Sequence, residues 1–231
     1  MSTTSVDIHG GHGGHEEHAH DPHQQHHFTT MEQQFDTAKL GMWIFLATEI
    51  LLFGGLFVGF GMMQGRYPQE FLEAHEHLKR WQGALNTVVL LFSSFTMVMA
   101  VDAAKTNKRQ KSVTFLFITI LCACVFLVVK YFEYAHKFEE GWLPGKFYHG
   151  TSDAIPGSHG YATFFAFYFM MTGLHGIHIL VGIGLLSWIL FRARKGEFSN
   201  AYYTPVDLVG LYWHIVDMIW IYLFPLYYLI Q

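Results

Sequence analysis

Long apolar stretches dominate this chain, and they begin only after a polar first segment. Each stretch approaches or exceeds the roughly 20 residues that a helix needs to cross about 30 Å of hydrocarbon. The apolar runs are continuous instead of alternating, which favours helices over the strands of a transmembrane barrel. We therefore predict an all-α integral membrane bundle of five transmembrane helices. The expected spans are residues 37–63, 81–104, 113–138, 159–191 and 206–230.

The first segment, residues 1–36, contains almost no apolar side chains and cannot bury a core, so we expect a disordered tail. Residues 37–231 then form the membrane domain, in which we expect no metal site. The tail is rich in histidine, whose imidazole binds Zn, Cu or Ni. A solvated tail with incidental metal affinity explains this composition, so we predict weak metal sites only. These histidines are His9, His12, His15, His18, His20, His23, His26 and His27.

The overall composition supports a membrane protein. Only 14% of the 231 residues are charged and 52% are hydrophobic, whereas about 25% of the residues in an ordinary soluble domain are charged. The formal net charge is −4, and the sequence has no large basic patch, which argues against nucleic acid as a partner.

Lysines and arginines are unevenly divided between the two sides of a chain with five spans. Eight fall on the side of the N-terminus and five on the opposite side. Because cytoplasmic loops carry the excess of Lys and Arg, we predict a cytoplasmic N-terminus and a periplasmic C-terminus. The eight are Lys39, Lys105, Lys108, Arg109, Lys111, Arg192, Arg194 and Lys195.

Ionisable residues occur near the middle of three predicted spans, where a charge costs about 2.5–3.5 kcal/mol on insertion scales. Glu49 lies in the first span, so it should be protonated or meet a donor on another helix. His175 and His178 lie in the fourth span, and His214 and Asp217 share a face of the fifth. We predict a buried polar layer built from these five residues, although the sequence does not show which pairs touch.

Three interpretations of this layer compete. It can be structural, with interhelical hydrogen bonds worth about 0.6 kcal/mol each. It can be a site that handles protons or contacts lipid. It can also hold haem, with His175 or His178 on one side and His214 on the other as axial ligands.

Two further groups lie near span ends. Lys130 and Glu133 are three residues apart, which allows an ion pair on one helix face, or Lys130 can extend toward the headgroups. Either role is favoured over a catalytic lysine. Aromatic residues also cluster near span ends and predict an interfacial belt. They are Trp81, Trp142, Tyr148, Tyr202, Tyr203, Tyr227 and Tyr228.

Five groups of short motifs, one in each predicted span, occur in a characteristic order. They are Gly41–Phe45 with Thr48 and Glu49, Leu85–Thr87 with Leu90–Ser94, Glu133 with Tyr134, Gly173–His178, and Tyr212–Asp217 with Trp220. This series resembles subunit III of the haem-copper cytochrome oxidases, over about Leu40 to Ile230. The long form of that family has seven helices, and the five expected here match a short bacterial form.

The resemblance implies a subunit of an enzyme complex, cytochrome c oxidase, with no redox centre in this chain. Haem and copper are then expected in the partner catalytic subunits, with subunits I and II and phospholipids as neighbours. The implied role is to support proton uptake and the stability of the catalytic subunit during O2 reduction, in the bacterial inner membrane. Glu49 corresponds to the family's carbodiimide-reactive carboxylate. Glu133, His175, His178, His214 and Asp217 are polar members of the matching motifs.

Alternatives stay open at this point. Short forms also occur in quinol oxidases, so the electron donor is either cytochrome c or quinol, and membership of a larger respiratory supercomplex is undecided. The family has Gln where this chain has Lys130. A self-contained cytochrome with two histidine ligands is a rival from another class. A proton-coupled carrier that uses Glu49 and Asp217 is a weaker rival, because the spans show no obvious inverted repeat.

Overall fold

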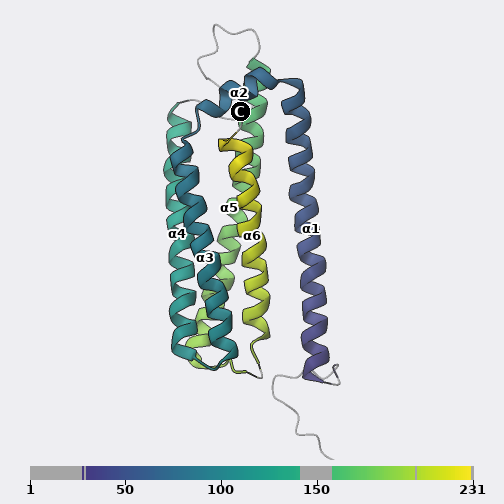
Figure 1. Cartoon of the computed structure of the whole chain (residues 1–231), viewed down its shortest axis with the longest axis vertical. Coiled ribbons are helices and arrows are strands. Elements are labelled where there is room, and N and C mark those ends of the chain that lie inside the picture. The colour runs from purple at the N-terminus through teal and green to yellow at the C-terminus, as the bar shows by residue number, and fades with distance from the viewer. Residues whose placement is uncertain (1–27, 29, 141–157, 201, 230–231) are drawn as a thin grey trace, which may run out of the picture.

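The computed structural model describes residues 28, 30–140, 158–200 and 202–229. Five long helices in these ranges are long and apolar enough to cross a membrane, which confirms the predicted five-span bundle. A short helix, α2, lies between the first two spans (Figure 1). The helices are α1 (Met31–Arg66), α2 (Pro68–Glu76), α3 (Arg80–Lys105), α4 (Arg109–Glu139), α5 (Ser158–Lys195) and α6 (Thr204–Tyr228).

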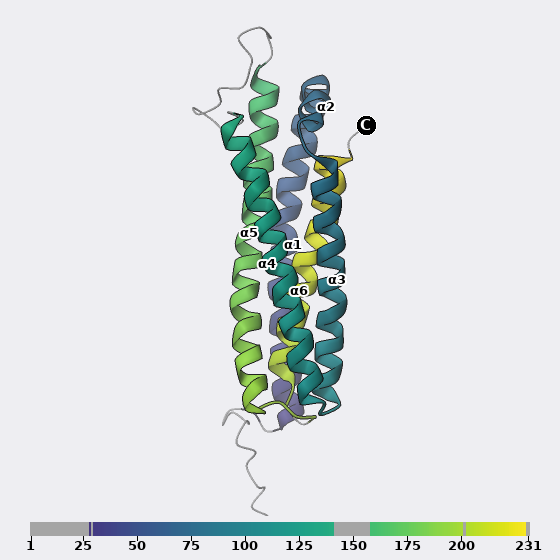
Figure 2. The same ribbon diagram turned by 90° about the vertical axis from the view of Figure 1, so that its left-hand side faces the viewer.

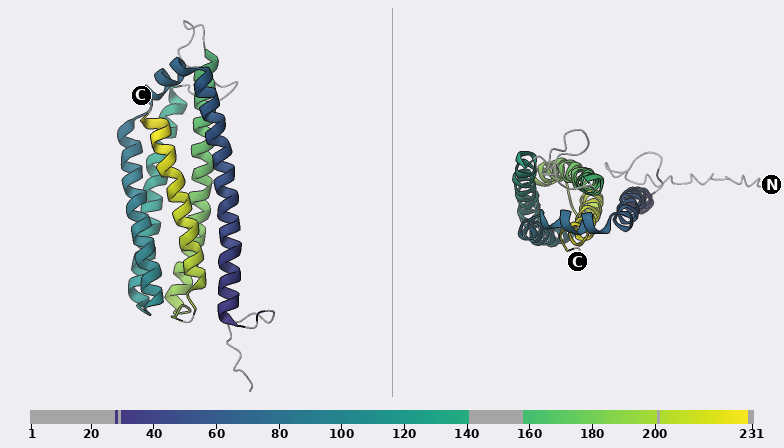
Figure 3. Two further views of the ribbon diagram at one scale, coloured as in Figure 1. Left: turned by 45° about the vertical axis from the view of Figure 1, so that its right-hand side comes forward. Right: turned by 90° about the horizontal axis from the view of Figure 1, so that it is seen from above.

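Helices α3, α4, α5 and α6 surround one common core, and α1 stands outside this group beside α6 (Figure 3). The long helices run nearly parallel to one another along the length of the molecule (Figure 2). The short helix α2 crosses the end of the bundle and connects α1 to α3 (Figure 1). The bundle proper is therefore a group of four helices with a fifth attached at its side.

Helix α1 is attached along a narrow stripe. Its buried residues are Leu46, Phe53 and Phe60, which recur every seven positions, the spacing at which a helix returns to the same face. Most of its other large apolar side chains are exposed, as expected for a helix whose remaining faces contact lipid. They include Leu40, Trp43, Ile44, Ile50, Leu51, Val58 and Met62.

Helix α6 is the opposite case and forms the centre of the core. In its most apolar window 56% of residues are buried, against 17% for α1. Trp213 fits against α5 because position 182 is a glycine. A Cβ there would lie 2.6 Å from the Trp213 ring, closer than real carbon contacts allow. The sequence thus uses a small residue to bring the two helices together.

One boundary differs from the prediction. Helix α1 begins at Met31 because the Thr30 side chain accepts a hydrogen bond from the Gln33 amide (3.1 Å) and so caps it. Residues 31–36 are therefore helical, and assigning them to a disordered tail was wrong. The connection between the predicted spans 37–63 and 81–104 contains a short helix, α2, which begins at Pro68 because proline suits the first turn of a helix. The tail histidines, His9 to His27, lie outside the described residues.

Candidate functional site

Glu49 on α1 meets His178 on α5. The Glu49 Oε2 and His178 Nε2 atoms are 2.9 Å apart, and the two side chains are 14% and 15% exposed. The other ring nitrogen, Nδ1, donates to the Leu174 carbonyl at 2.8 Å, so Nε2 of the neutral ring is an acceptor. A protonated Glu49 then donates to a neutral imidazole, or an imidazolium donates to a carboxylate. Glu49 therefore meets a side chain on another helix, which is one of the two outcomes that the sequence leaves open.

An apolar groove of about 420 Å³ borders this pair between α1, α5 and α6. Met42, Phe45, Val181 and Tyr212 line it together with His178. The Tyr212 hydroxyl donates to the His178 carbonyl at 3.0 Å. The groove gives an apolar molecule access to the His178 end of the pair without passing through the four-helix core.

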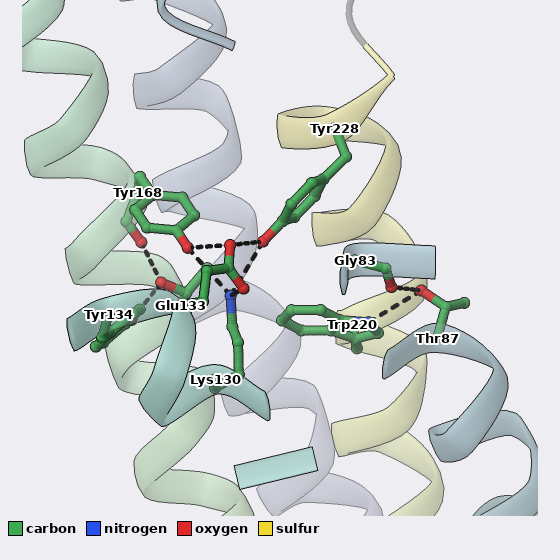
Figure 4. Close-up of polar contacts among 9 residues, drawn as sticks. Gly83, Thr87, Lys130, Glu133, Tyr134, Tyr168, Trp220 and Tyr228 are labelled. Atoms are coloured by element: carbon green, nitrogen blue, oxygen red, sulfur yellow. Dashed lines mark hydrogen bonds and ion pairs between the residues drawn. The ribbon is translucent and has the colours of Figure 1, made fainter. Parts of the chain in front are cut away.

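An enclosed ion pair, Lys130 and Glu133, lies toward the end of α4. The Lys130 Nζ lies 3.0 Å from Glu133 Oε2, and the side chains are only 7% and 3% exposed. Nζ also donates to the hydroxyls of Tyr168 (3.2 Å) and Tyr228 (3.1 Å), which in turn donate to Glu133 Oε1 (Figure 4). All three ammonium hydrogens therefore have partners.

This cluster decides two expectations. The ion pair between Lys130 and Glu133 is confirmed, and extension of Lys130 to the headgroups is wrong, because the Lys130 Nζ is enclosed by α4, α5 and α6 and lies 5.0 Å from the Trp220 ring. Tyr227 and Tyr228 are fully buried, so placing them in an interfacial belt was also wrong. Tyrosine hydroxyls are needed inside because a buried charge pair is stable only when its remaining donors and acceptors are satisfied.

Asp217 and His214 on α6 both face α3. Asp217 Oδ2 accepts from the Ser93 hydroxyl at 3.4 Å, and His214 Nδ1 lies 2.7 Å from the Ser94 hydroxyl. Ser93 also accepts from the Trp213 indole N–H at 3.0 Å. Asp217 is 2% exposed, and its Oδ1 has no hydrogen-bond partner among the described residues.

His175 is separate from these pairs. Its ring is fully buried between Phe126 (centroids 5.5 Å apart) and Trp220 (5.2 Å). Neither ring nitrogen has a hydrogen-bond partner among the described residues.

The predicted polar layer is thus divided among different helix contacts. Glu49 meets His178 across α1 and α5, whereas His214 and Asp217 meet serines of α3. His178 and His214 point to different neighbours, which disfavours the haem interpretation. In the described part of the chain no three His, Cys, Asp or Glu side chains group together in a way that could hold a metal ion.

Comparison with known proteins decides the family. A family model described as cytochrome c oxidase subunit III matches residues 19–230. This chain belongs to the cytochrome c oxidase subunit III family. As a member of that family it is a multi-pass membrane protein and a partner of other oxidase subunits.

Curated relatives of this subunit III family member carry two kinds of name. The quinol oxidase subunit 3 of Bacillus spizizenii is 30% identical over 86% of this chain and 91% of its own length. The cytochrome c oxidase subunit 3 of Thermostichus vulcanus is 30% identical over 84% of this chain and 88% of its own length. A probable cytochrome c oxidase subunit 3 of Rickettsia bellii is 28% identical over 83% of this chain and 68% of its own.

Sequence reasoning missed several polar partners in this family member. Ser93 and Ser94 lie inside a quoted motif, so their contacts with α6 had a signal, but their hydroxyls were not assigned a role. Tyr168 gave no signal, because a tyrosine in an apolar run is ordinary core material. Only the fold shows that its hydroxyl reaches Glu133.

Proposed function

We propose that this chain is the non-catalytic subunit III of a bacterial haem-copper terminal oxidase, in which subunits I and II hold the haem and copper. It lies in the cytoplasmic membrane with a cytoplasmic N-terminus and a periplasmic C-terminus. Its role is to support proton uptake by the catalytic subunit and the stability of that subunit during O2 reduction. The observation that carries the proposal is the family match over residues 19–230, together with the motif carboxylate Glu49 paired inside the bundle.

The arrangement of the helices favours a role in supporting the catalytic subunit over a catalytic role of its own. Two acid–base pairs inside the spans are formed within this chain: Glu49 with His178, and Lys130 with Glu133. The exposed surface at mid-height consists largely of apolar side chains of α1, α3, α4 and α5. Such a surface suits the apolar flank of another membrane subunit or phospholipid acyl chains. The groove of about 420 Å³ beside His178 has the apolar lining that an acyl chain requires.

Co-purification tests the proposal. An affinity tag at the C-terminus and mild detergent should yield this chain with a haem-copper catalytic subunit in equal amounts, identified by mass spectrometry and by the visible haem spectrum. A chain that never accompanies such a subunit would overturn the proposal. A haem band in the isolated chain that disappears in His214→Ala would favour the rival cytochrome with two histidine ligands.

The electron donor has two candidates, because relatives of equal identity are named cytochrome c oxidase and quinol oxidase. We favour cytochrome c. Oxygen consumption by the purified complex with reduced cytochrome c, and in parallel with a quinol, separates the two. A complex that consumes oxygen only with the quinol would replace the first candidate with the second.

Removal of this chain tests its role. A complex without it should begin turnover but lose activity faster over successive turnovers, because the catalytic subunit would lack the support proposed here. Equal rates and equal lifetimes with and without the chain would contradict the supporting role while leaving the family assignment intact.

A further inference from the structure

Helix α6 lies between α1 and α3 on one side of the bundle and packs against both (Figure 1). Two grooves run along its outer surface. One, of about 350 Å³, lies against α3 and is lined on α6 by Leu211 and His214. The other, of about 280 Å³, lies against α1 and is lined on α6 by Met218 and Tyr222. We call the surface formed by these four residues the α6 face.

The α6 face has the spacing of a helix-packing surface. Its residues follow one another at intervals of three or four positions, as along the stripe by which one helix packs lengthwise against another. Met218 and Tyr222 are 49% and 64% exposed, and Leu211 and His214 are half-buried. Helix α6 thus fills the core with one side and leaves a continuous stripe on the other.

The two helices that flank the α6 face are connected at both ends. At the start of α6, the Asp207 carboxylate lies 3.5 Å from Lys39 of α1 and 3.5 Å from Lys105 of α3. At the opposite end of the bundle, helix α2 connects α1 to α3. The recess between α1 and α3 therefore has its shape before a partner binds, which reduces the cost of ordering on binding.

His214 decides which kind of molecule fits this recess. Its Nδ1 lies 2.7 Å from the Ser94 hydroxyl, and Nε2 makes no hydrogen bond to the described residues. Helix α6 rises about 1.5 Å per residue, so His214 lies about 15 Å from the start of the helix, near the middle of a hydrocarbon core. Both imidazole nitrogens form hydrogen bonds, and acyl chains at this depth offer Nε2 no partner.

The outer surface of α4 provides a contrast. Its exposed side chains at similar depth include Leu121, Val125 and Val128. These side chains are apolar and require no neighbour more polar than an acyl chain. We therefore expect lipid on this side of the bundle.

We propose that the α6 face is the docking surface for a transmembrane helix of the haem-copper catalytic subunit, which forms a hydrogen bond to His214 at mid-depth. The inference rests on the function proposed above and adds which side of this chain the subunit contacts. A helix accounts for the recess better than lipid does, because it places side chains in both grooves and also brings a polar group to Nε2. The unbranched side chain of Met218 adapts readily to such a neighbour.

Photo-crosslinking in the purified complex tests this assignment. The photo-reactive amino acid p-benzoylphenylalanine replaces Met218 or Tyr222 on the α6 face, and Leu121 or Val128 on α4 as matched controls. Met218 and Leu121 lie about 20 Å from the starts of their helices, so the depth is similar. After illumination, mass spectrometry should find the catalytic subunit joined to the two α6 positions, with only background levels at the two α4 positions.

Cross-links to the catalytic subunit from the α4 positions alone, or equally from both surfaces, would overturn the inference and leave the proposed function intact. Lipid adducts or a different subunit as the only products at positions 218 and 222 would overturn it in the same way. If no haem-copper subunit accompanies the chain, the proposed function and this inference are both wrong.

Three variants test the hydrogen bond at His214 in the same complex. His214→Leu should speed the loss of the catalytic subunit in detergent by about threefold, the effect of an average hydrogen bond between membrane helices. His214→Gln keeps a donor and an acceptor and should remove most of that difference. Ser94→Ala deletes the partner of His214 within this chain but keeps the imidazole, so the rate of loss should stay close to that of the unchanged complex.

Equal rates of loss in Ser94→Ala and His214→Leu would show that His214 serves only its contact with α3, and would overturn its role in docking. A rate in His214→Leu equal to that of the unchanged complex would do the same.

Discussion

Two buried pairs of acid and base stand on different sides of the bundle and are built differently. Lys130 and Glu133 lie on neighbouring turns of one helix, enclosed by tyrosine hydroxyls from α5 and α6. Glu49 and His178 come from different helices, are about 15% exposed and border an apolar groove. The first pair stabilises charge inside the core, and the second holds one proton at the attachment of a peripheral helix. An acid–base pair is thus sealed inside the core in one place and joins a peripheral helix to the bundle in the other.

The largest expected effect is on the enclosed pair. Lys130→Met removes the cation and leaves Glu133 uncompensated, so the free energy of unfolding should fall by about 3–5 kcal/mol. Thermal unfolding in detergent measures this change. Lys130→Met combined with Glu133→Gln should recover most of the loss, because no charge then remains buried.

Lys111→Met on the same helix is the matched control. Lys111 is exposed, so its replacement should change stability by less than about 0.5 kcal/mol. Similar losses of stability in Lys111→Met and Lys130→Met would show that the enclosure of Lys130 by tyrosines does not explain the loss.

The second effect contrasts the tight packing of α6 with the loose attachment of α1. Gly182→Ala places a methyl group 2.6 Å from Trp213, and overpacking of this kind costs about 1–3 kcal/mol. Gly54→Ala on α1 meets nothing within 4 Å, so it should be neutral or stabilise by up to about 1 kcal/mol. Unfolding midpoints of the two variants compare them directly. If Gly182→Ala left stability unchanged, close packing of Trp213 against position 182 would not be what holds α5 and α6 together.

The third effect concerns the pair that links α1 to α5. Glu49→Leu leaves His178 Nε2 without its partner, which should cost about 1–2 kcal/mol. Glu49→Gln keeps a donor to Nε2 and should change stability by less than about 1 kcal/mol, with assembly and haem spectra intact. Labelling by an apolar carbodiimide should occur in the unchanged protein and disappear in Glu49→Gln. Labelling that persists in Glu49→Gln would place the reactive carboxyl elsewhere.

The smallest effect is a pH dependence at the end of α4, outside the spans. Burial tends to raise the pKa of Glu140, but the hydrogen bond and charge of Lys137 and the nearby His136 outweigh it and lower that pKa. Burial, then the charge of Lys137, lowers the pKa of His77 below 6.5. In both cases the unfolded chain binds protons more readily, so stability is complete above the unfolded pKa values and falls on acidification.

The His77 contribution should begin to decrease below about pH 6.5, and the Glu140 contribution below about pH 4.5. Unfolding midpoints measured across this range should depend less on pH in His77→Asn and Glu140→Gln. Because both groups are near solvent, the expected shifts are small. If both variants lost stability on acidification as much as the unchanged protein, other groups would be responsible for that loss.

Much of the fold was predictable from the sequence, and less of the site. The pairing of Lys130 with Glu133 was one of two roles that the sequence allowed, because side chains three residues apart are neighbours on a helix. The single polar layer was not borne out as one unit, because residues at similar depth on different helices face different neighbours. Glu49 and His178 are 129 positions apart, and no local pattern encodes which way each helix is rotated. The buried tyrosines were mistaken for interfacial ones for the same reason.

The sequence by itself determined the five spans, and it made an ion pair between Lys130 and Glu133 one of two open roles. Crossing hydrocarbon requires about 20 apolar residues with internally satisfied backbone groups, and both requirements are local. The tertiary structure alone decided that α1 stands outside the four-helix core, that Tyr228 contacts Lys130 from 98 positions away, and that His214 contacts Ser94 on α3. These features depend on helix rotation and close packing, which side chains of distant segments settle together.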